Sequence, residues 1–104
     1  MKSSEIFIKT PAEIKIMRFG GKILADVLAE TSKLAKAGVS TAELNDFAEK
    51  FIHDRGGKPA FKGYRGFPAA LCTAINEVVV HGIPRKDEIL KEGDLLTLDC
   101  GVLY

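Results

Sequence analysis

The chain has 104 residues, 15 of them basic and 14 acidic, and a formal net charge of +1. The length fits one domain rather than two, and 46% apolar residues are enough for a core, which argues against a disordered chain. The balanced charge argues against a chain-wide attraction for nucleic acid, and no apolar run approaches the ~20 residues of a membrane span.

The first half of the chain predicts two helices, and the first of them starts at a capping box. Thr10 accepts from the amide of Glu13 in such a box, while the Glu13 carboxylate reaches back to the amide of Thr10. Apolar residues then recur at three- and four-residue spacing, and we expect the helix to end at Gly38. The predicted buried stripe consists of Ile14, Met17, Gly21, Leu24, Leu28, Thr31 and Ala35. We interpret the glycines at 20 and 21 as a place of close packing against a sheet, although a kink is equally compatible.

A second helix is predicted directly after the first. Ser40 and Glu43 form a second capping box, and Val39 and Leu44 stand at the two positions of a hydrophobic staple. The sequence Arg-Gly-Gly at 55–57 predicts the end of this helix. The predicted buried face consists of Leu44, Phe47, Ala48, Phe51 and Ile52.

The second half of the chain changes to strands and loops. Residues 56–68 hold four glycines and two prolines, which predicts a long irregular loop. Two β-prone runs, residues 71–75 and 78–81, are expected to pair around a turn at 76–77, and residues 95–99 form a further strand. This order predicts an α+β fold with two helices on one face of a mainly antiparallel sheet.

Two titratable residues in this half could carry chemistry. Asp99 ends an apolar run, so its carboxylate is paired, bound to a cation, or placed at a turn before Gly101. His81 follows three valines and is either a structural histidine or a donor to a substrate carbonyl. The other histidine, His53, falls near the end of the second helix, where it complements the helix dipole.

A third candidate is the loop of residues 61–68, where Phe61, Tyr64 and Phe67 alternate with basic residues. This interleaving suits stacking on single-stranded nucleic acid, and the same aromatic content suits a pocket for an apolar side chain; the composition does not decide between them. Cys72 either lines such a pocket or is a small buried hydrophobe. Two cysteines make no disulfide framework and residues 1–10 lack a secretory core, so we expect a cytoplasmic location.

Three segments taken in order resemble one family. Residues 63–68 (GYRGFP), 72–84 (CTAINEVVVHGIP) and 93–101 (GDLLTLDCG) are similar to the type I methionine aminopeptidases, which have the pita-bread fold. The resemblance covers essentially the whole chain but only the first part of that family's domain. It implies that residues 1–104 are the N-terminal part of the catalytic domain and form the N-terminal half of the pita-bread fold.

The resemblance also implies a metal site. In that family two adjacent divalent ions are held by two aspartates, one histidine and two glutamates, and Asp99 matches the first aspartate. The other four ligands are expected beyond Tyr104, so we expect this chain alone not to hold the two ions. The pattern does not distinguish Co, Mn, Fe, Zn and Ni.

Residue roles follow from the same resemblance. His81 matches a histidine that hydrogen-bonds the substrate near the scissile bond and stabilises the tetrahedral intermediate. Arg65 stands where many members carry histidine, and at one pocket position several bacterial members carry cysteine where this chain has phenylalanine. The positions that match the pocket for the methionine side chain are Phe61, Tyr64, Phe67 and Cys72.

The resemblance therefore implies a metal-dependent aminopeptidase that removes the initiator methionine from nascent proteins, close to the ribosome and without a membrane association. We expect the 104 residues by themselves to be inactive. The alternative is a non-catalytic module that binds a nascent peptide, RNA or another protomer. Residues 102–104 would form a strand edge without its partner, which predicts self-association of the isolated chain.

Overall fold

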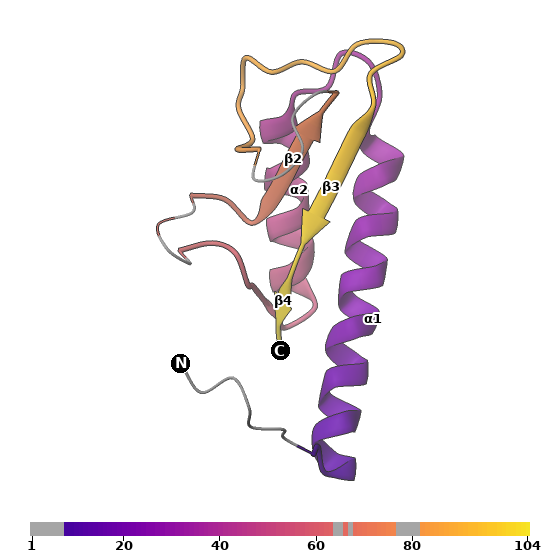
Figure 1. Ribbon diagram of the computed structural model, residues 1–104, viewed down its shortest axis with the longest axis vertical. Coiled ribbons are helices and arrows are strands. Elements are labelled where there is room, and N and C mark those ends of the chain that lie inside the picture. Colours follow the sequence, from indigo (N-terminus) through magenta and orange to yellow (C-terminus); the bar gives the residue numbers. More distant parts are fainter. Residues whose placement is uncertain (1–7, 64–65, 67, 77–81) are drawn as a thin grey trace.

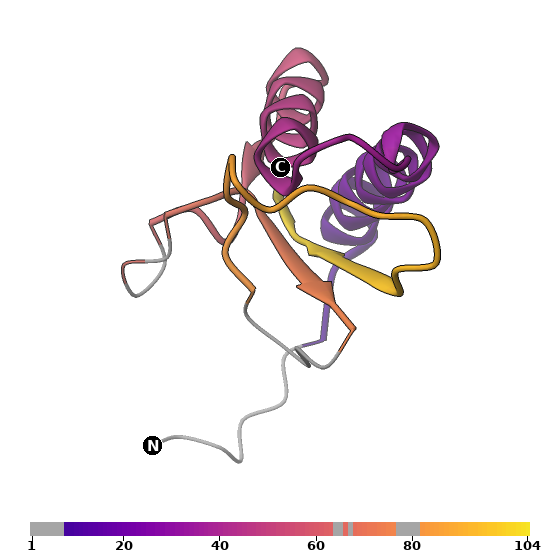
Figure 2. The ribbon, with the colours of Figure 1, turned by 90° about the horizontal axis from the view of Figure 1, so that it is seen from above.

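The computed structural model describes residues 8–63, 66, 68–76 and 82–104. Within these residues the two helices lie on one side of a pair of antiparallel strands, as Figure 2 shows from above. The predicted α+β arrangement is therefore confirmed. The elements in chain order are α1 (Pro11–Leu34), α2 (Thr41–Asp54), β1 (Lys58–Pro59), β2 (Leu71–Ile75), β3 (Leu96–Cys100) and β4 (Val102–Leu103), shown in Figure 1.

The N-terminus of α1 is the predicted capping box. The amide of Thr10 donates to the Glu13 carboxylate at 2.8 Å, and the amide of Glu13 donates to the Thr10 hydroxyl at 3.2 Å. The predicted end at Gly38 is wrong, because α1 ends at Leu34. Gly38 has a φ of +95° and its amide donates to the carbonyl of Leu90 at 2.9 Å, so a distant segment takes the place of a helix carbonyl.

The buried face of α1 differs in part from the predicted stripe. Its buried residues are Ile23, Val27 and Thr31, whereas Met17 is 59% exposed and every residue from 11 to 19 is exposed. A Cβ atom on Gly20 would lie 3.3 Å from the Cβ of Tyr104, so this glycine is a place of close packing beside the end of β4. The first half of the helix therefore extends past the core (Figure 1).

Helix α2 matches its prediction closely. The amide of Glu43 donates to the Ser40 hydroxyl at 3.1 Å, and the helix ends at Asp54 before Gly56, whose φ is +83°. Its buried residues are Thr41, Leu44, Ala48 and Ile52. Neither described helix has an apolar stretch long enough to span a bilayer.

The strand pairing adds to one expectation and corrects another. Strand β2 pairs antiparallel with β3, which follows it by some twenty residues. The expected hairpin of residues 71–75 with 78–81 stays a prediction, because residues 78–81 lie outside the described residues. The predicted loop at 56–68 contains β1, which pairs antiparallel with β4. The edge at Val102–Leu103 is therefore covered on one side by Lys58–Pro59.

The core lies between the helices and the β2–β3 pair. Strand residues alternate in direction, so one face of this pair contacts the helices and the other faces away from them. Residues of both helices, β2, β3 and the segment before β3 form one buried cluster: Val27, Leu44, Ala48, Ile52, Leu71, Leu90 and Cys100.

Candidate functional site

The candidate site lies on the sheet face that points away from the helices. Leu71 and Cys100 are paired neighbours that belong to the core, so the next pair along, Cys72 and Asp99, points to the opposite face. Asp99 is exposed and Cys72 is 8% exposed. Residues 27 positions apart in sequence are thus directly opposite one another on antiparallel strands.

Both thiols beside Asp99 are kept protonated at neutral pH. Burial raises the pKa of the Cys72 thiol, and the negative charge of Asp99 raises it further. Burial raises the pKa of Cys100 to about 11. Neither cysteine is therefore an activated nucleophile, and Cys72 presents a neutral, apolar side chain to the site.

Phe61 approaches the same end of β3 from the loop after β1. The amide of Ala60 donates to the carbonyl of Gly101 at 2.9 Å. A Cβ atom on Gly101 would lie 2.9 Å from the Cβ of Ala60 and 3.3 Å from Cε1 of Phe61. The absence of a side chain at 101 therefore lets the Phe61 ring pack close to the strand, two residues after Asp99.

The structure thus brings three of the predicted site residues to one end of the β2–β3 pair: Phe61, Cys72 and Asp99. The other three predicted site residues, Tyr64, Phe67 and His81, lie outside the described residues.

Sequence reasoning missed the residues that anchor the chain on either side of residues 77–81. Asn76 has a φ of +54°, and its side-chain carbonyl accepts from the amide of Leu95 at 3.0 Å. Its side-chain amide donates to Asp94 at 3.1 Å. Asparagine tolerates the left-handed conformation better than most residues, so its presence at 76 is the sequence feature that could have indicated this turn. Asn76 therefore ties the end of β2 to the start of β3.

Gly82 is the anchor on the other side. The amide of Thr73 donates to the carbonyl of Gly82 at 3.0 Å, so the chain returns alongside β2 one residue from Cys72. A Cβ atom on Gly82 would lie 1.6 Å from the carbonyl oxygen of Thr73. Only glycine fits at this position.

The described residues do not by themselves build a metal centre. Asp99 offers an exposed carboxylate on the site face, but within residues 8–63, 66, 68–76 and 82–104 no three His, Cys, Asp or Glu side chains gather closely enough to hold a metal ion. Its cross-strand neighbour Cys72 adds a single thiol. A divalent ion held by several oxygen or imidazole ligands needs donors in addition to these.

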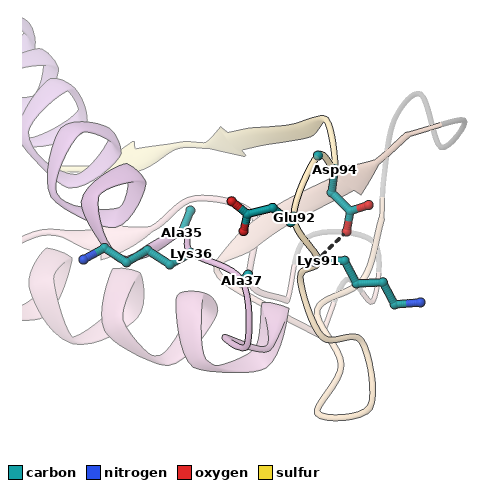
Figure 3. Close-up of a pocket in the computed structure, with 7 residues that line it drawn as sticks. Ala35, Lys36, Ala37, Lys91, Glu92 and Asp94 are labelled. Carbon is teal, nitrogen blue, oxygen red and sulfur yellow. Dashed lines mark hydrogen bonds between the residues drawn. The ribbon is translucent and has the colours of Figure 1, made fainter.

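Two surface depressions lie away from Asp99. One, of about 560 Å³, lies between the α1–α2 linker and the turn before β3 (Figure 3). Figure 3 shows the amine groups of Lys36 and Lys91 pointing away from each other. The other, of about 330 Å³, is an apolar groove between α1 and the end of the chain, lined by Ile16, Met17, Gly20, Gly21, Leu24, Val102, Leu103 and Tyr104.

Comparisons with known proteins identify similar chains. The sequence pattern of metallopeptidase family M24 matches residues 15–104. A methionine aminopeptidase of Clostridium acetobutylicum is 51% identical over 98 residues, which cover 94% of this chain and 39% of that protein. Methionine aminopeptidase 1 of Bacillus subtilis is 47% identical over 96 residues, which cover 92% of this chain and 38% of that protein.

The fold matches solved structures over the same extent. The crystal structure of a methionine aminopeptidase from Thermotoga maritima superimposes with a TM-score of 0.93 at 40% identity, covering 96% of this chain and 40% of that one. The methionine aminopeptidase from Rickettsia prowazekii gives a TM-score of 0.92 at the same identity and coverage. The chain therefore spans about two fifths of the length of these relatives.

Proposed function

The chain belongs to metallopeptidase family M24, and from this premise we propose that it forms the N-terminal part of a methionine aminopeptidase catalytic domain. The proposed enzyme is a hydrolase that removes the initiator methionine from nascent proteins, in the cytoplasm and near the ribosome. The observation that supports it most is the cross-strand pair of Cys72 and Asp99, with Phe61 packed beside it, within a segment 51% identical to a methionine aminopeptidase.

The proposed roles divide the site into a metal side and a substrate side. Asp99 supplies one carboxylate ligand to the two divalent ions of the complete site, and the remaining ligands come from outside the described residues. Family M24 implies divalent metal ions, and Co, Mn, Fe, Zn and Ni are all compatible with a carboxylate ligand. His81 donates a hydrogen bond to the substrate near the scissile bond.

The substrate side is an apolar pocket. Phe61 and Cys72, together with Tyr64 and Phe67, contact the methionine side chain. The raised pKa of Cys72 supports this role because a neutral thiol keeps charge out of the pocket. A flexible thioether gains about 0.3–1.5 kcal/mol from each sulfur–aromatic contact, which favours methionine over shorter aliphatic side chains.

A chimera tests the proposal. This chain replaces the matched segment of the C. acetobutylicum relative, and the product is assayed with a Met-Ala peptide and Co²⁺ or Mn²⁺. We expect the chimera to be active and the 104-residue polypeptide alone to be inactive, because its described residues do not gather a metal site. Asp99→Asn in the chimera is expected to lower kcat/KM by about 100-fold or more, since it removes a proposed ligand.

Asp46→Asn is the matched control, because it makes the same change at an exposed aspartate on α2. It is expected to leave kcat/KM unchanged. A folded but inactive chimera, or an Asp99→Asn chimera with normal activity, would contradict the proposed function.

The apolar groove between α1 and β4 supports a second proposal, that the isolated chain binds another copy of itself. The groove exposes Met17, Leu103 and Tyr104, each more than half exposed. Apolar surface of this kind favours association over exposure to water. The same observation is the one that favours the alternative function, a non-catalytic binding module.

A further inference from the structure

Helix α2 and the start of β2, which lie beside each other in Figure 1, are joined by the side chain of Asn45. The side-chain carbonyl oxygen of Asn45 accepts from the amide of Ala70 at 2.9 Å and from the amide of Leu71 at 3.1 Å. Asn45 is half-buried, whereas Ala70 and Leu71 are completely buried. One acceptor on the helix therefore serves the two consecutive amides that directly precede Cys72.

The bond to Leu71 lies at the edge of β2 that faces away from β3. Successive amides of a strand alternate between its two edges. The amide of Thr73 donates to the carbonyl of Gly82, which is not part of β3, and Leu71 is two residues earlier, so its amide points to the same edge. Asn45 therefore holds the start of β2 on the side that β3 does not reach.

Cys72 is thus held from two sides. It pairs with Asp99 across the strands, and α2 holds the residue that directly precedes it. The carbonyl of Ala70 also accepts from the Cys100 thiol at 3.8 Å, but a thiol is a weak donor. Of these contacts to the residues before Cys72, the two amide bonds to Asn45 are the stronger.

The same side of α2 also contacts the chain beside Phe61. Glu49 is one turn after Asn45 on the helix, and its carboxylate accepts from the amine of Lys62 at 2.7 Å. The Lys62 side chain is half exposed, and such surface ion pairs contribute little to stability. Helix α2 therefore contacts both chain segments that carry the described pocket residues, and its firmer contact is the one at Asn45.

We propose that Asn45 is a positioning residue for Cys72, acting through the amides of Ala70 and Leu71. This inference rests on the proposed place of Cys72 in the methionine pocket. Removing the acceptor leaves two consecutive amides without this partner in buried residues, and such a loss is unfavourable. The start of β2 then opens to hydrate these amides, and Cys72 leaves its place opposite Asp99 for part of the time.

The test uses the 104-residue chain and two readouts. Alkylation of Cys72 by iodoacetamide, located by mass spectrometry, reports how often this thiol leaves its buried place, and amide exchange reports the opening of the strand. In Asn45→Ala we expect alkylation of Cys72 and exchange at Leu71 to accelerate about tenfold. Exchange at Ala74, which lies later in β2, is expected to stay at the wild-type rate.

Two further variants show whether the acceptor oxygen itself matters. Asn45→Asp keeps an oxygen in the same place and is expected to restore the wild-type rates at Cys72 and Leu71. Glu49→Ala is the matched control, because it removes another half-buried polar side chain from the same helix, and it is expected to leave alkylation of Cys72 unchanged. Equal acceleration in both alanine variants, or faster exchange at Leu71 without faster alkylation of Cys72, overturns the proposal.

A measurement on the wild type covers the case in which Asn45→Ala does not fold. The amides of Ala70 and Leu71 are expected to exchange as slowly as that of Ala74, and rapid exchange at 70 and 71 overturns the proposal. These readouts need no turnover, so an inactive chimera would count against the peptidase and not against them. In an active chimera, Asn45→Ala is expected to raise KM for the Met-Ala peptide more than it changes kcat, with rescue by Asn45→Asp, because the pocket binds the side chain while the proposed ligand Asp99 is retained.

Discussion

At the scale of single residues, Asp94 shows how one carboxylate can join two segments. It accepts from the backbone amide of Lys91 at 2.9 Å and from the side-chain amide of Asn76 at 3.1 Å. The bond from Lys91, followed by that from Asn76, holds the pKa of Asp94 below its ordinary value of 3.8. The folded state therefore binds this proton more weakly than the unfolded state does.

This shift predicts a pH dependence. Because the folded pKa is the lower one, the stability that Asp94 contributes is present above pH 3.8 and is lost as the pH falls through the folded pKa. Asp94→Asn is expected to lower the free energy of unfolding at neutral pH, and the difference from wild type is expected to shrink in acid. Urea unfolding followed by circular dichroism at several pH values measures this. A difference that stays constant over the whole range would contradict the assignment.

The roles of some residues could be predicted from the sequence and those of others could not. The difference lies in how far away in the sequence their interaction partners are. The partner of Thr10 is three residues away, so its capping box is visible in the sequence, and both of its bonds are confirmed. Of the second predicted box, the bond from the Glu43 amide to the Ser40 hydroxyl is confirmed. Asp99 left several interpretations open because Cys72 lies opposite it only through the pairing of β2 with β3. Thr41 gave no signal beyond its place in a capping motif, since its hydroxyl bonds residues 44 and 47 positions away.

At the scale of elements, α1 consists of two halves with different supports. From residue 23 onward it packs on the core through Ile23, Val27 and Thr31. Residues 11–19 are all exposed, so apart from the stacking of Phe19 on Tyr104 this part depends on its own helical hydrogen bonds and on the cap at Thr10. A helix that lacks packing depends strongly on its termini, because short isolated helices are marginal in water.

Thr10→Ala is therefore expected to fray the exposed half of α1. Loss of such a cap costs about 1 kcal/mol, which corresponds to amide exchange about fivefold faster in the first turns. The amides of α2 are expected to keep their wild-type exchange rates. Thr10→Ser, which keeps the oxygen, is the matched control. Equal acceleration in α1 and α2 would show that the cap acts on the whole fold.

The elements also show why the sequence predicts only part of the strand pairing. The pairing of β2 with β3 joins segments some twenty residues apart, and no local pattern indicates it. Short-range patterns report strand propensity but not partner choice, which depends on which distant segment packs over the helices. For the same reason the sequence predicts a loop where β1 lies: its two residues are ordered by pairing with β4 near the other end of the chain.

At the scale of the whole molecule, the apolar groove at α1 and β4 is the main departure from an ordinary protein surface. Phe19 stacks on Tyr104 with ring centroids 5.3 Å apart, and both remain more than half exposed. Beside them, Met17 and Leu103 line the groove. Exposed apolar side chains gathered in this way mark an interaction surface.

Met17→Lys is expected to weaken self-association of the isolated chain, because it places a charge in the groove that would have to be desolvated. Sedimentation or light scattering over a wide range of concentrations measures the effect. Ala29→Lys, at an exposed position of α1 outside the groove, adds the same charge and is expected to leave association unchanged. A wild-type chain that stays monomeric at every concentration would contradict the proposal.

The hydrogen bonds between residues 85–90 and the start of α2 have a consequence for the order in which the chain folds during synthesis. A ribosome releases the helical half first, but the start of α2 lacks its partners until Arg85 and Glu88 have emerged. Likewise, β1 cannot pair until Val102 and Leu103 have been synthesised. The helical residues are therefore synthesised early, but their tertiary contacts form late. A nascent chain shorter than about ninety residues exposes the apolar faces of its helices, because Leu90 and β3, which cover them in the folded chain, have not yet been synthesised.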